Sequence, residues 1–335
     1  MTNAEPEFIR SLPKAELHLH IEGSLEPELM LSLASKNGIK LPYEKLADIE
    51  AAYHFDDLQS FLDLYYMGAG VLIHEQDFYD LMWRYMLRCK EENIVHTEMM
   101  FDPQTHTDRG IAFETVINGF CRAMDDARNE WGQSAELIMC FLRHLSEEDA
   151  IATLDASLPY KDKIIAVGLD SSEVGHPPEK FERVFEMAEK AGFLRVAHAG
   201  EEGPAQYIRD AIELLGVSRI DHGVRCVDDV ALVSELAASR MPLTVCPLSN
   251  VRLRVYESMT EHPILNLLAQ DVCVTVNSDD PSYFGGYLCA NYEALSSHLQ
   301  MTREQAVELA KNSFEASFLT QKDKQRYSDM LDLID

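Results

Sequence analysis

Eight short apolar runs, rich in β-branched and aromatic residues, recur along the chain between stretches with the spacing of amphipathic helices. Alternation of strand and helix predicts a parallel sheet, because parallel strands need a long crossover connection that is usually a helix. Eight repeats of a strand followed by a helix favour a closed (β/α)8 barrel of the TIM type over an open doubly wound sheet. A dinucleotide-binding fold is disfavoured, since no Gly-x-Gly-x-x-Gly follows the first run. The predicted strands are Ala15–His20, Ile94–Phe101, Leu137–Leu142, Ile164–Leu169, Leu194–His198, Arg219–His222, Leu243–Cys246 and Cys273–Asn277.

The intervals between these runs carry helix signals. From Pro178 to Ala188 apolar residues recur at spacings of three and four, and Gly192 after Lys190 is typical of a helix C-terminus. The interval from His20 to Ile94 is too long for one crossover. We expect several helices there, one of them containing residues 61–66, and a lid over the mouth of the barrel. We expect residues 1–335 to form a single barrel domain with helical insertions.

Composition narrows the class of partner. Asp and Glu number 57 against 29 Lys and Arg, which gives a net charge of −28. Such a surface repels nucleic-acid phosphates and anionic lipid, so we expect a small-molecule substrate and neither a nucleic-acid nor a membrane partner. The N-terminus lacks the pattern of a signal peptide. The seven cysteines are scattered without a Cys-x-x-Cys pair, which indicates reduced thiols in a cytoplasmic enzyme.

The first predicted strand carries a metal-binding pattern. His18 and His20 are two residues apart and point to one face of a strand. Alone, such a pair is more typical of ordinary half-buried histidines. Three later segments, 196–201, 220–223 and 276–281, change this interpretation, because each follows an apolar run and ends in residues able to bind a metal or move a proton, and the carboxyl ends of barrel strands form one face. Catalytic zinc takes nitrogen and oxygen ligands and keeps one position for water, so His18, His20, His198 and Asp279 predict a zinc site.

Proton-transfer groups lie close to these ligands in sequence. Glu201 follows His198 in a glycine-containing loop, where a carboxyl group beside a metal suits a general acid. Its neighbour Glu202 fits an exposed loop position better, although the pattern does not separate the two. His222 ends another predicted strand and suits the task of orienting and deprotonating water. Asp280 follows Asp279, so that one carboxylate binds metal while the other faces the substrate. His262 is expected to be a solvated loop histidine.

Five motifs together resemble the adenosine/adenine deaminase branch of the amidohydrolase superfamily over nearly the whole chain. They are Pro13-Lys14-Ala15-Glu16-Leu17-His18-Leu19-His20, His198-Ala199-Gly200-Glu201, Asp221-His222-Gly223, Cys246-Pro247-Leu248-Ser249-Asn250 and Asn277-Ser278-Asp279-Asp280-Pro281.

The resemblance implies a zinc-dependent (β/α)8 barrel that hydrolyses the 6-amino group of a purine, with one Zn²⁺ per chain. It implies that His18, His20, His198 and Asp279 are the zinc ligands. It also implies that Glu201 gives a proton to the purine N1, that His222 positions and deprotonates water, and that Asp280 hydrogen-bonds N7. The other reactant is water.

Two departures from the adenosine-specific pattern bear on the substrate. Glu22 stands where adenosine deaminases typically have an aspartate that contacts the sugar, and Glu173 lies where they have an Ala-Gly pair. Both departures add carboxyl-bearing bulk, and a buried carboxylate needs a partner, which the N3 and N9–H edge of a free base supplies. The segment 20–28 closely resembles the adenine deaminase group. We therefore expect hydrolysis of adenine to hypoxanthine and ammonia, as in purine salvage, with Glu22 and Glu173 as substrate contacts.

Three alternatives stay open on the sequence. The same pocket would serve a deaminase of N6-substituted adenines such as cytokinins, if the space around C6 is larger. A second alternative is an adenosine deaminase. A third, from a different class, is a catalytically silent purine- or metal-binding protein, against which the presence of both Glu201 and His222 argues.

Overall fold

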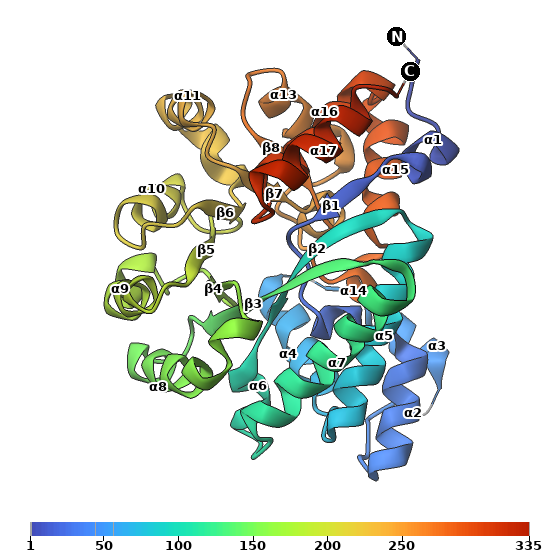
Figure 1. The fold of residues 1–335 in the computed structure, drawn as a ribbon, viewed down its shortest axis with the longest axis vertical. Coiled ribbons are helices and arrows are strands. Elements are labelled where there is room, and N and C mark those ends of the chain that lie inside the picture. Colours follow the sequence, from blue (N-terminus) through green and yellow to red (C-terminus); the bar gives the residue numbers. More distant parts are fainter. Residues whose placement is uncertain (1, 44, 56, 335) are drawn as a thin grey trace.

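Eight parallel strands, hydrogen-bonded in the order β1 to β8, form the centre of the computed structural model (Figure 1), which describes residues 2–43, 45–55 and 57–334. The ring closes where the segment after β1 meets the segment after β8, through a parallel bridge between Leu19 and Asp279. This confirms the predicted (β/α)8 barrel. The strands are β1 (Lys14–Glu16), β2 (Ile94–Phe101), β3 (Ser134–Leu142), β4 (Ala166–Asp170), β5 (Leu194–Ala199), β6 (Arg219–His222), β7 (Leu243–Val245) and β8 (Val274–Val276).

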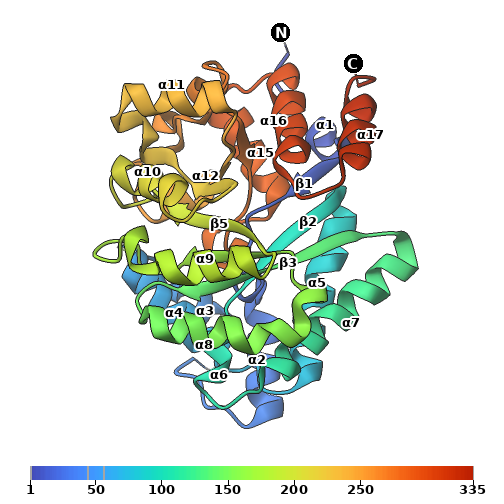
Figure 2. The same cartoon turned by 60° about the vertical axis from the view of Figure 1, so that its left-hand side comes forward.

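Helices occupy every interval between strands, and α8 to α11 follow one another around the outside of the barrel (Figure 1, Figure 2). In the described part of the chain, no helix is long and apolar enough to cross a membrane. The α-helices are α1 (Pro6–Ser11), α2 (Pro27–Asn37), α3 (Leu46–Ala52), α4 (Leu58–Ala69), α5 (Glu75–Glu91), α6 (Pro103–Thr107), α7 (Phe113–Trp131), α8 (Glu147–Ser157), α9 (Glu182–Lys190), α10 (Ala205–Glu213), α11 (Val230–Ser239), α12 (Pro247–Arg252), α13 (Ile264–Leu268), α14 (Pro281–Phe284), α15 (Leu288–Leu299), α16 (Arg303–Ala316) and α17 (Gln321–Leu331). Short 3₁₀ turns are η1 (Glu22–Ser24), η2 (Leu158–Lys163), η3 (Pro178–Phe181), η4 (Val224–Asp228) and η5 (Met259–Glu261).

The first strand is shorter than predicted. It ends at Glu16, and the two histidines of the metal-binding pattern lie beyond it. The ladder stops because the backbone N–H of Leu17 donates to the Asn277 side chain instead of a neighbouring strand (2.9 Å). Beyond this point His20 N–H donates to the carbonyl of Asp279, and Asp279 N–H donates to the carbonyl of His18. His18 and His20 therefore lie on an extended segment that is hydrogen-bonded to the loop after β8.

The long insertion between β1 and β2 holds several helices, as predicted. Residues 61–66 lie in α4, which begins with a capping box in which the Asp57 side chain accepts from Ser60 N–H at 2.8 Å. The helix expected at 178–190 is also present, as η3 followed by α9, and Gly192 takes the left-handed conformation (φ 84°) that ends it.

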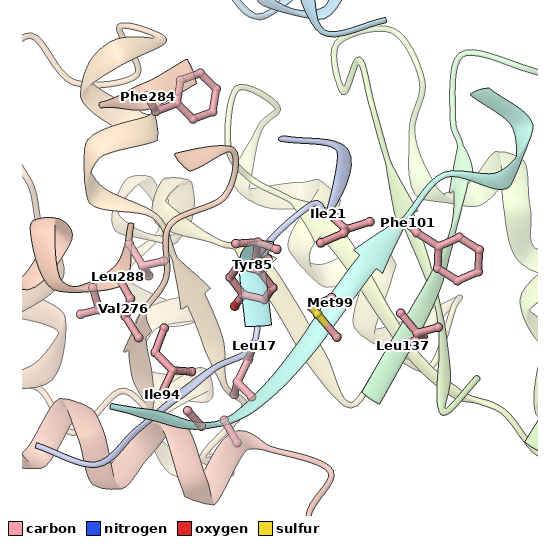
Figure 3. Close-up of a cluster of buried hydrophobic side chains, with 14 of the residues drawn as sticks. Leu17, Ile21, Tyr85, Ile94, Met99, Phe101, Leu137, Val276, Phe284 and Leu288 are labelled. Carbon is pink, nitrogen blue, oxygen red and sulfur yellow. The ribbon is translucent and has the colours of Figure 1, made fainter. Parts of the chain in front are cut away.

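One large apolar cluster fills the space between strands and helices. Leu17, Met99 and Leu137, from three neighbouring segments of the barrel wall, are fully buried in it (Figure 3). We expect a core of this size to hold the fold together without a contribution from any single polar site. The barrel therefore supports the strand-end loops as a rigid frame, on which functional side chains are placed.

Candidate active site

Four side chains from the two ends and the middle of the sequence converge at the mouth of the barrel. His18 Nε2 lies 3.3 Å and His20 Nε2 lies 3.5 Å from Asp279 Oδ1, and His20 Nε2 lies 3.2 Å from His198 Nε2. All four residues are at most 7% exposed. The structure thus brings together every residue that the sequence suggested as a metal ligand.

The opposite nitrogen of each histidine ring faces a protein acceptor. His18 Nδ1 lies 3.0 Å from the carbonyl of Thr244, His20 Nδ1 lies 3.5 Å from Asp170 Oδ2, and His198 Nδ1 lies 3.6 Å from Asp221 Oδ2. Metal-binding histidines are typically oriented in this way, with the outer N–H directed at a carbonyl or carboxylate. His18 Nε2 is buried without a hydrogen-bond partner among the described residues. This donor set fits a divalent cation such as zinc.

Electrostatics agree with this arrangement. Burial alone would raise the pKa of Asp279, but the adjacent His18 ring holds it well below its usual range. Burial, reinforced by the neighbouring imidazoles, places the pKa of His198 well below its usual range. Burial alone would lower the pKa of His18, but the buried charge of Asp279 outweighs this effect and raises it instead. A carboxylate at Asp279 and a neutral imidazole at His198 are the protonation states in which these side chains bind metal.

Backbone strain marks the same region. His222 and Asp279 both have φ of 62°, in the left-handed region that non-glycine residues rarely adopt. Each such residue costs on the order of 1–3 kcal/mol, and the surrounding barrel has to hold it in place. His222 ends β6 and Asp279 lies in the loop after β8, and both residues line the cavity.

Glu201 lies in the loop after β5 and lines the cavity at the barrel mouth. It is 4% exposed, its Oε1 has no hydrogen-bond partner in the described chain, and its Oε2 lies 3.6 Å from His222 Nε2. Burial, with the charge of Asp279, raises the pKa of Glu201 well above its usual range. A protonated Glu201 is therefore available to donate into the cavity.

The loop that carries Glu201 is held by a second glutamate. The Glu173 carboxylate accepts four backbone N–H groups, from Gly200, Glu201, Glu202 and Gly203, at 2.6 to 3.0 Å. Glu173 is 1% exposed. Its side chain thus lies behind the cavity wall, where the backbone amides occupy both oxygens.

Glu22 is likewise behind the wall. Its Oε1 lies 2.8 Å from His106 Nε2, and Arg109 donates to the other ring nitrogen of His106 at 2.9 Å. His106 therefore donates to Glu22 through Nε2. Burial lowers the pKa of His106 to about 3 and raises the pKa of Glu22 to about 7. We expected both Glu22 and Glu173 to contact a purine. Both oxygens of Glu173 accept backbone N–H groups, whereas Glu22 Oε2 is buried without a hydrogen-bond partner among the described residues.

A hydrogen-bond chain fixes the ring of His222. Ile264 N–H donates to His262 Nδ1 (3.3 Å), so the neutral His262 carries its hydrogen on Nε2, which lies 3.2 Å from Asn250 Oδ1. The Asn250 amide nitrogen then faces His222 Nδ1 at 3.4 Å. Burial lowers the pKa of both histidines to about 3. The neutral His222 accordingly carries its hydrogen on Nε2, toward Glu201 and Asp279.

Asp280 completes the mouth beside Asp279. It is 3% exposed, lines the cavity, and has an Oδ1 without a partner among the described residues. Burial, together with the charge of Asp279, raises the pKa of Asp280 well above its usual range. The absence of a side chain at Gly23 makes room for it, since a Cβ there would come within 1.9 Å of Asp280 Oδ1. Both aspartates face the cavity, as the sequence suggested.

Comparison with known proteins fits this geometry. The sequence profile described as "Adenosine deaminase" matches residues 13–334. The chain belongs to the adenosine deaminase family. The chain is 61% identical to the adenine deaminase of Hahella chejuensis over 326 residues, which cover 97% of this chain and 98% of the relative.

Two solved structures extend the comparison of this adenosine deaminase family member. The crystal structure of adenine deaminase from Arthrobacter aurescens is 49% identical, with a TM-score of 0.94 over 96% of this chain and 98% of that chain. A zinc-bound amidohydrolase from Burkholderia ambifaria is 25% identical, with a TM-score of 0.91 over 100% and 94% of the two chains.

Sequence reasoning missed two features of the site. His262 is not solvated but 3% exposed, and it orients His222 through Asn250. Asp102, at the end of β2, lines the cavity. The signal for Asp102 was present, because a strand-end aspartate followed by proline occurs at Asp102-Pro103 as it does at Asp280-Pro281. The cavity is lined by His20, Leu58, Phe61, Leu62, Tyr65, Tyr66, Asp102, Asp170, Ser171, His198, Glu201, His222, Leu253, Asp279, Asp280 and Phe284.

Proposed function

We infer that the protein is an adenine deaminase, which hydrolyses adenine to hypoxanthine and ammonia as in purine salvage. The observation that carries the inference is the convergence of Glu201, His222 and Asp280 on one cavity beside three histidines and Asp279. Two relatives named adenine deaminase, each about 60% identical over nearly the full chain, support the inference.

We propose one Zn²⁺ per chain, held by His18, His20, His198 and Asp279. The zinc-bound relative from Burkholderia ambifaria supports this choice of metal. When bound, the ion supplies a water whose pKa is lowered from 15.7 toward about 7, so that a nucleophile exists at neutral pH.

Glu201 prepares the purine for attack. Its proton passes to N1, and this makes C6 electrophilic because positive charge on N1 withdraws electrons from the ring. The raised pKa of Glu201 keeps that proton on the carboxyl group until the purine arrives. N7 is a hydrogen-bond acceptor, so Asp280 recognises it in the protonated form that its own raised pKa favours. The two carboxyl groups thereby hold the base from both sides of C6.

His222 acts on the attacking water. Its Nε2 lies within 3.7 Å of both Glu201 and Asp279, which supports a role for this ring beside the attacking water. A base at Nε2 would need the opposite tautomer, so we propose that His222 positions and polarises the water. The water oxygen bonds to C6, one of its protons restores Glu201, and the other reaches the amino group, which leaves as ammonia when its bond to C6 breaks.

Glu22 and Glu173 influence substrate choice from behind the cavity wall in this proposal. Glu173 holds the loop that carries Glu201, and Glu22 accepts from the backbone N–H of Asp102 at 3.4 Å. The seven cysteines are free thiols, which is typical of the cytoplasm, the compartment in which we place the enzyme.

Ultraviolet absorbance with three substrates tests the function. Adenine should be consumed with equimolar release of hypoxanthine and ammonia, while adenosine and N6-isopentenyladenine react far more slowly under the same conditions. A clear preference for N6-isopentenyladenine would move the function to N6-substituted adenines. Binding of adenine to the zinc-loaded protein without turnover would instead indicate a catalytically silent purine-binding protein.

A further inference from the structure

We propose that Asp102 accepts a hydrogen bond from N9–H of adenine and so makes the cavity selective for free bases over N9-substituted purines. The inference rests on the proposed function, since it takes Glu201 at N1 and Asp280 at N7 as given. Asp102 follows β2 and is 2% exposed. The mechanism above leaves this buried carboxyl group without a task.

The orientation of the base follows from the order of the strands. N1 and N7 flank the reacting C6, whereas N3 and N9 lie on the opposite edge of the purine. Glu201 follows β5 and Asp280 follows β8, and the metal-binding residues follow or end β1, β5 and β8. The polar side chains of the cavity that remain come from the loop after β2, from the end of β4 and the residue after it, and from α4. They are Tyr65, Tyr66, Asp102, Asp170 and Ser171. The N3–N9 edge therefore faces this arc.

Most of these polar groups already have partners. Ser171 Oγ lies 2.9 Å from Tyr66 Oη and 2.9 Å from His144 Nδ1. Asp170 also has an oxygen without a partner, but its carboxyl group lies 3.5 Å from His20 Nδ1 and serves to orient that ring. The Asp102 carboxyl group also interacts with that of Asp170. Unlike Asp170, it forms no ion pair with a metal-binding histidine among the described residues, so we take Asp102 as the acceptor on this arc.

Asp102 presents one satisfied and one unsatisfied oxygen. Tyr65 donates to Oδ2 at 3.2 Å, while Oδ1 is buried without a hydrogen-bond partner among the described residues. A buried acceptor of this kind is costly unless a ligand or water satisfies it. N9–H of adenine is a donor of the required type. A nucleoside carries carbon at N9, so it leaves Oδ1 unpaired and brings its sugar against Tyr65 and Tyr66.

A second cation is the competing explanation for the open oxygen. Ligand atoms of His20, Asp102 and Asp170 all lie within 4.8 Å of one another. We favour the purine contact because His20 Nε2 is directed at the first metal site, and Asp102 faces the cavity in which the base has to lie. Metal analysis separates the two explanations.

The test compares substrates that differ only at N9. We would measure kcat/KM for adenine and 9-methyladenine with the zinc-loaded wild type and with the Asp102→Ala, Asp102→Asn and Asp108→Asn variants. Asp108 is exposed in the same segment and provides the matched loss of charge. The wild type should prefer adenine by about 10³-fold or more, since sites built around a hydrogen bond reject ligands that lack it.

Asp102→Ala should lower this preference by at least about 30-fold, mainly through loss of adenine turnover, and Asp108→Asn should leave it unchanged. Asp102→Asn keeps the shape of the side chain and a neutral acceptor, whose hydrogen bond is weaker by about half. The preference of this variant for adenine over 9-methyladenine should therefore fall between those of the wild type and Asp102→Ala. Binding of hypoxanthine and 9-methylhypoxanthine, measured by calorimetry, should show the same order without depending on catalysis.

Two results would overturn the inference. One is an unchanged preference for adenine over 9-methyladenine in both Asp102→Asn and Asp102→Ala. If the alanine variant does not fold, an unchanged preference in Asp102→Asn alone has the same meaning. The other is a second bound metal ion that Asp102→Ala removes. Failure of the wild type to deaminate adenine would refute the proposed function, and it is a distinct outcome, because the hypoxanthine binding measurement still reports on N9.

Discussion

Glu201 and Glu202 are neighbours in the sequence but lie in different surroundings. Glu201 lines the cavity and is 4% exposed, whereas Glu202 is only half-buried. The sequence could not separate them, because adjacent residues of a loop have no fixed direction. The difference arises from the turn after β5, where Gly200 takes a φ of 71°.

Replacing Glu201 by Gln should lower kcat by about 10⁴-fold, at the upper end of the usual range for general acids, because the amide has no proton to give to N1. The bound metal should remain. Steady-state kinetics with metal analysis checks this result, and Glu202→Gln serves as the control with nearly normal kcat. If Glu202→Gln lost activity and Glu201→Gln kept it, the assignment of the acid would be reversed. In the wild type, activity should fall as pH rises through the raised pKa of Glu201.

Glu173→Gln tests the hold on the Glu201 loop. A glutamine amide has one acceptor and places N–H groups against backbone N–H groups, so several of the four hydrogen bonds are lost. Hydrogen bonds to charged groups contribute about 1.5–3 kcal/mol each, and we expect the free energy of unfolding to fall by at least about 2 kcal/mol. The exposed Glu179 in the same segment gives the control, Glu179→Gln.

The kinetic consequence of Glu173→Gln distinguishes positioning from stability alone. We expect kcat to fall more than KM rises, and the high-pH limb of the kcat profile to shift, because Glu201 loses its fixed environment. Denaturation with urea and a pH series of kcat measure the two effects. An unchanged pH profile of kcat in a folded, metal-loaded Glu173→Gln variant would mean that Glu173 stabilises the loop but does not position Glu201.

At the scale of elements, the sequence predicted the barrel well and its first strand less well. Alternating apolar runs and helical spacing are local patterns, so eight strands and the helix at 178–190 were predictable. The end of β1 was not, because it depends on the Asn277 side chain, 260 residues away, which takes the N–H of Leu17. The directions of Glu22, Glu173 and His262 depend on equally distant partners.

The metal-binding set was predictable for a related reason. Residues at the carboxyl ends of barrel strands share one face whatever the details of their loops. His198 and Asp279 needed only this rule and the correct strand ends. Asp102, directly after β2, satisfies the same rule. The sequence did not single it out because no histidine lies beside it in the pattern of a metal-binding motif.

The helix α4 covers the cavity with Leu58, Phe61, Leu62, Tyr65 and Tyr66. Asp57→Ala removes the cap that begins this helix and should weaken it by about 1 kcal/mol. We expect faster amide hydrogen exchange over residues 58–69 and a higher KM for adenine, with little change in global stability. Thr320→Ala removes the comparable cap of α17, far along the chain, and should leave KM unchanged. An unaltered KM despite faster exchange in α4 would mean that this helix does not govern substrate binding.

For the molecule as a whole, the metal site and the fold should be separable. The large apolar core does not depend on the cluster of His18, His20, His198 and Asp279, so chelation should abolish activity and leave the circular dichroism spectrum of the barrel in place. The melting temperature should fall modestly, because the bound ion stabilises only the native state. Readdition of Zn²⁺ should restore activity. Full activity in protein shown by elemental analysis to contain no metal would contradict the proposed metal dependence.

The central claim is that the whole assembly recognises a free purine base and removes its 6-amino group. The most direct test is kcat/KM for adenine and for adenosine, measured on one zinc-loaded preparation under one set of conditions. We predict that kcat/KM for adenine exceeds that for adenosine by at least about three orders of magnitude, because ribose at N9 meets a wall built around a hydrogen bond to the free base. Comparable values for the two substrates would contradict it.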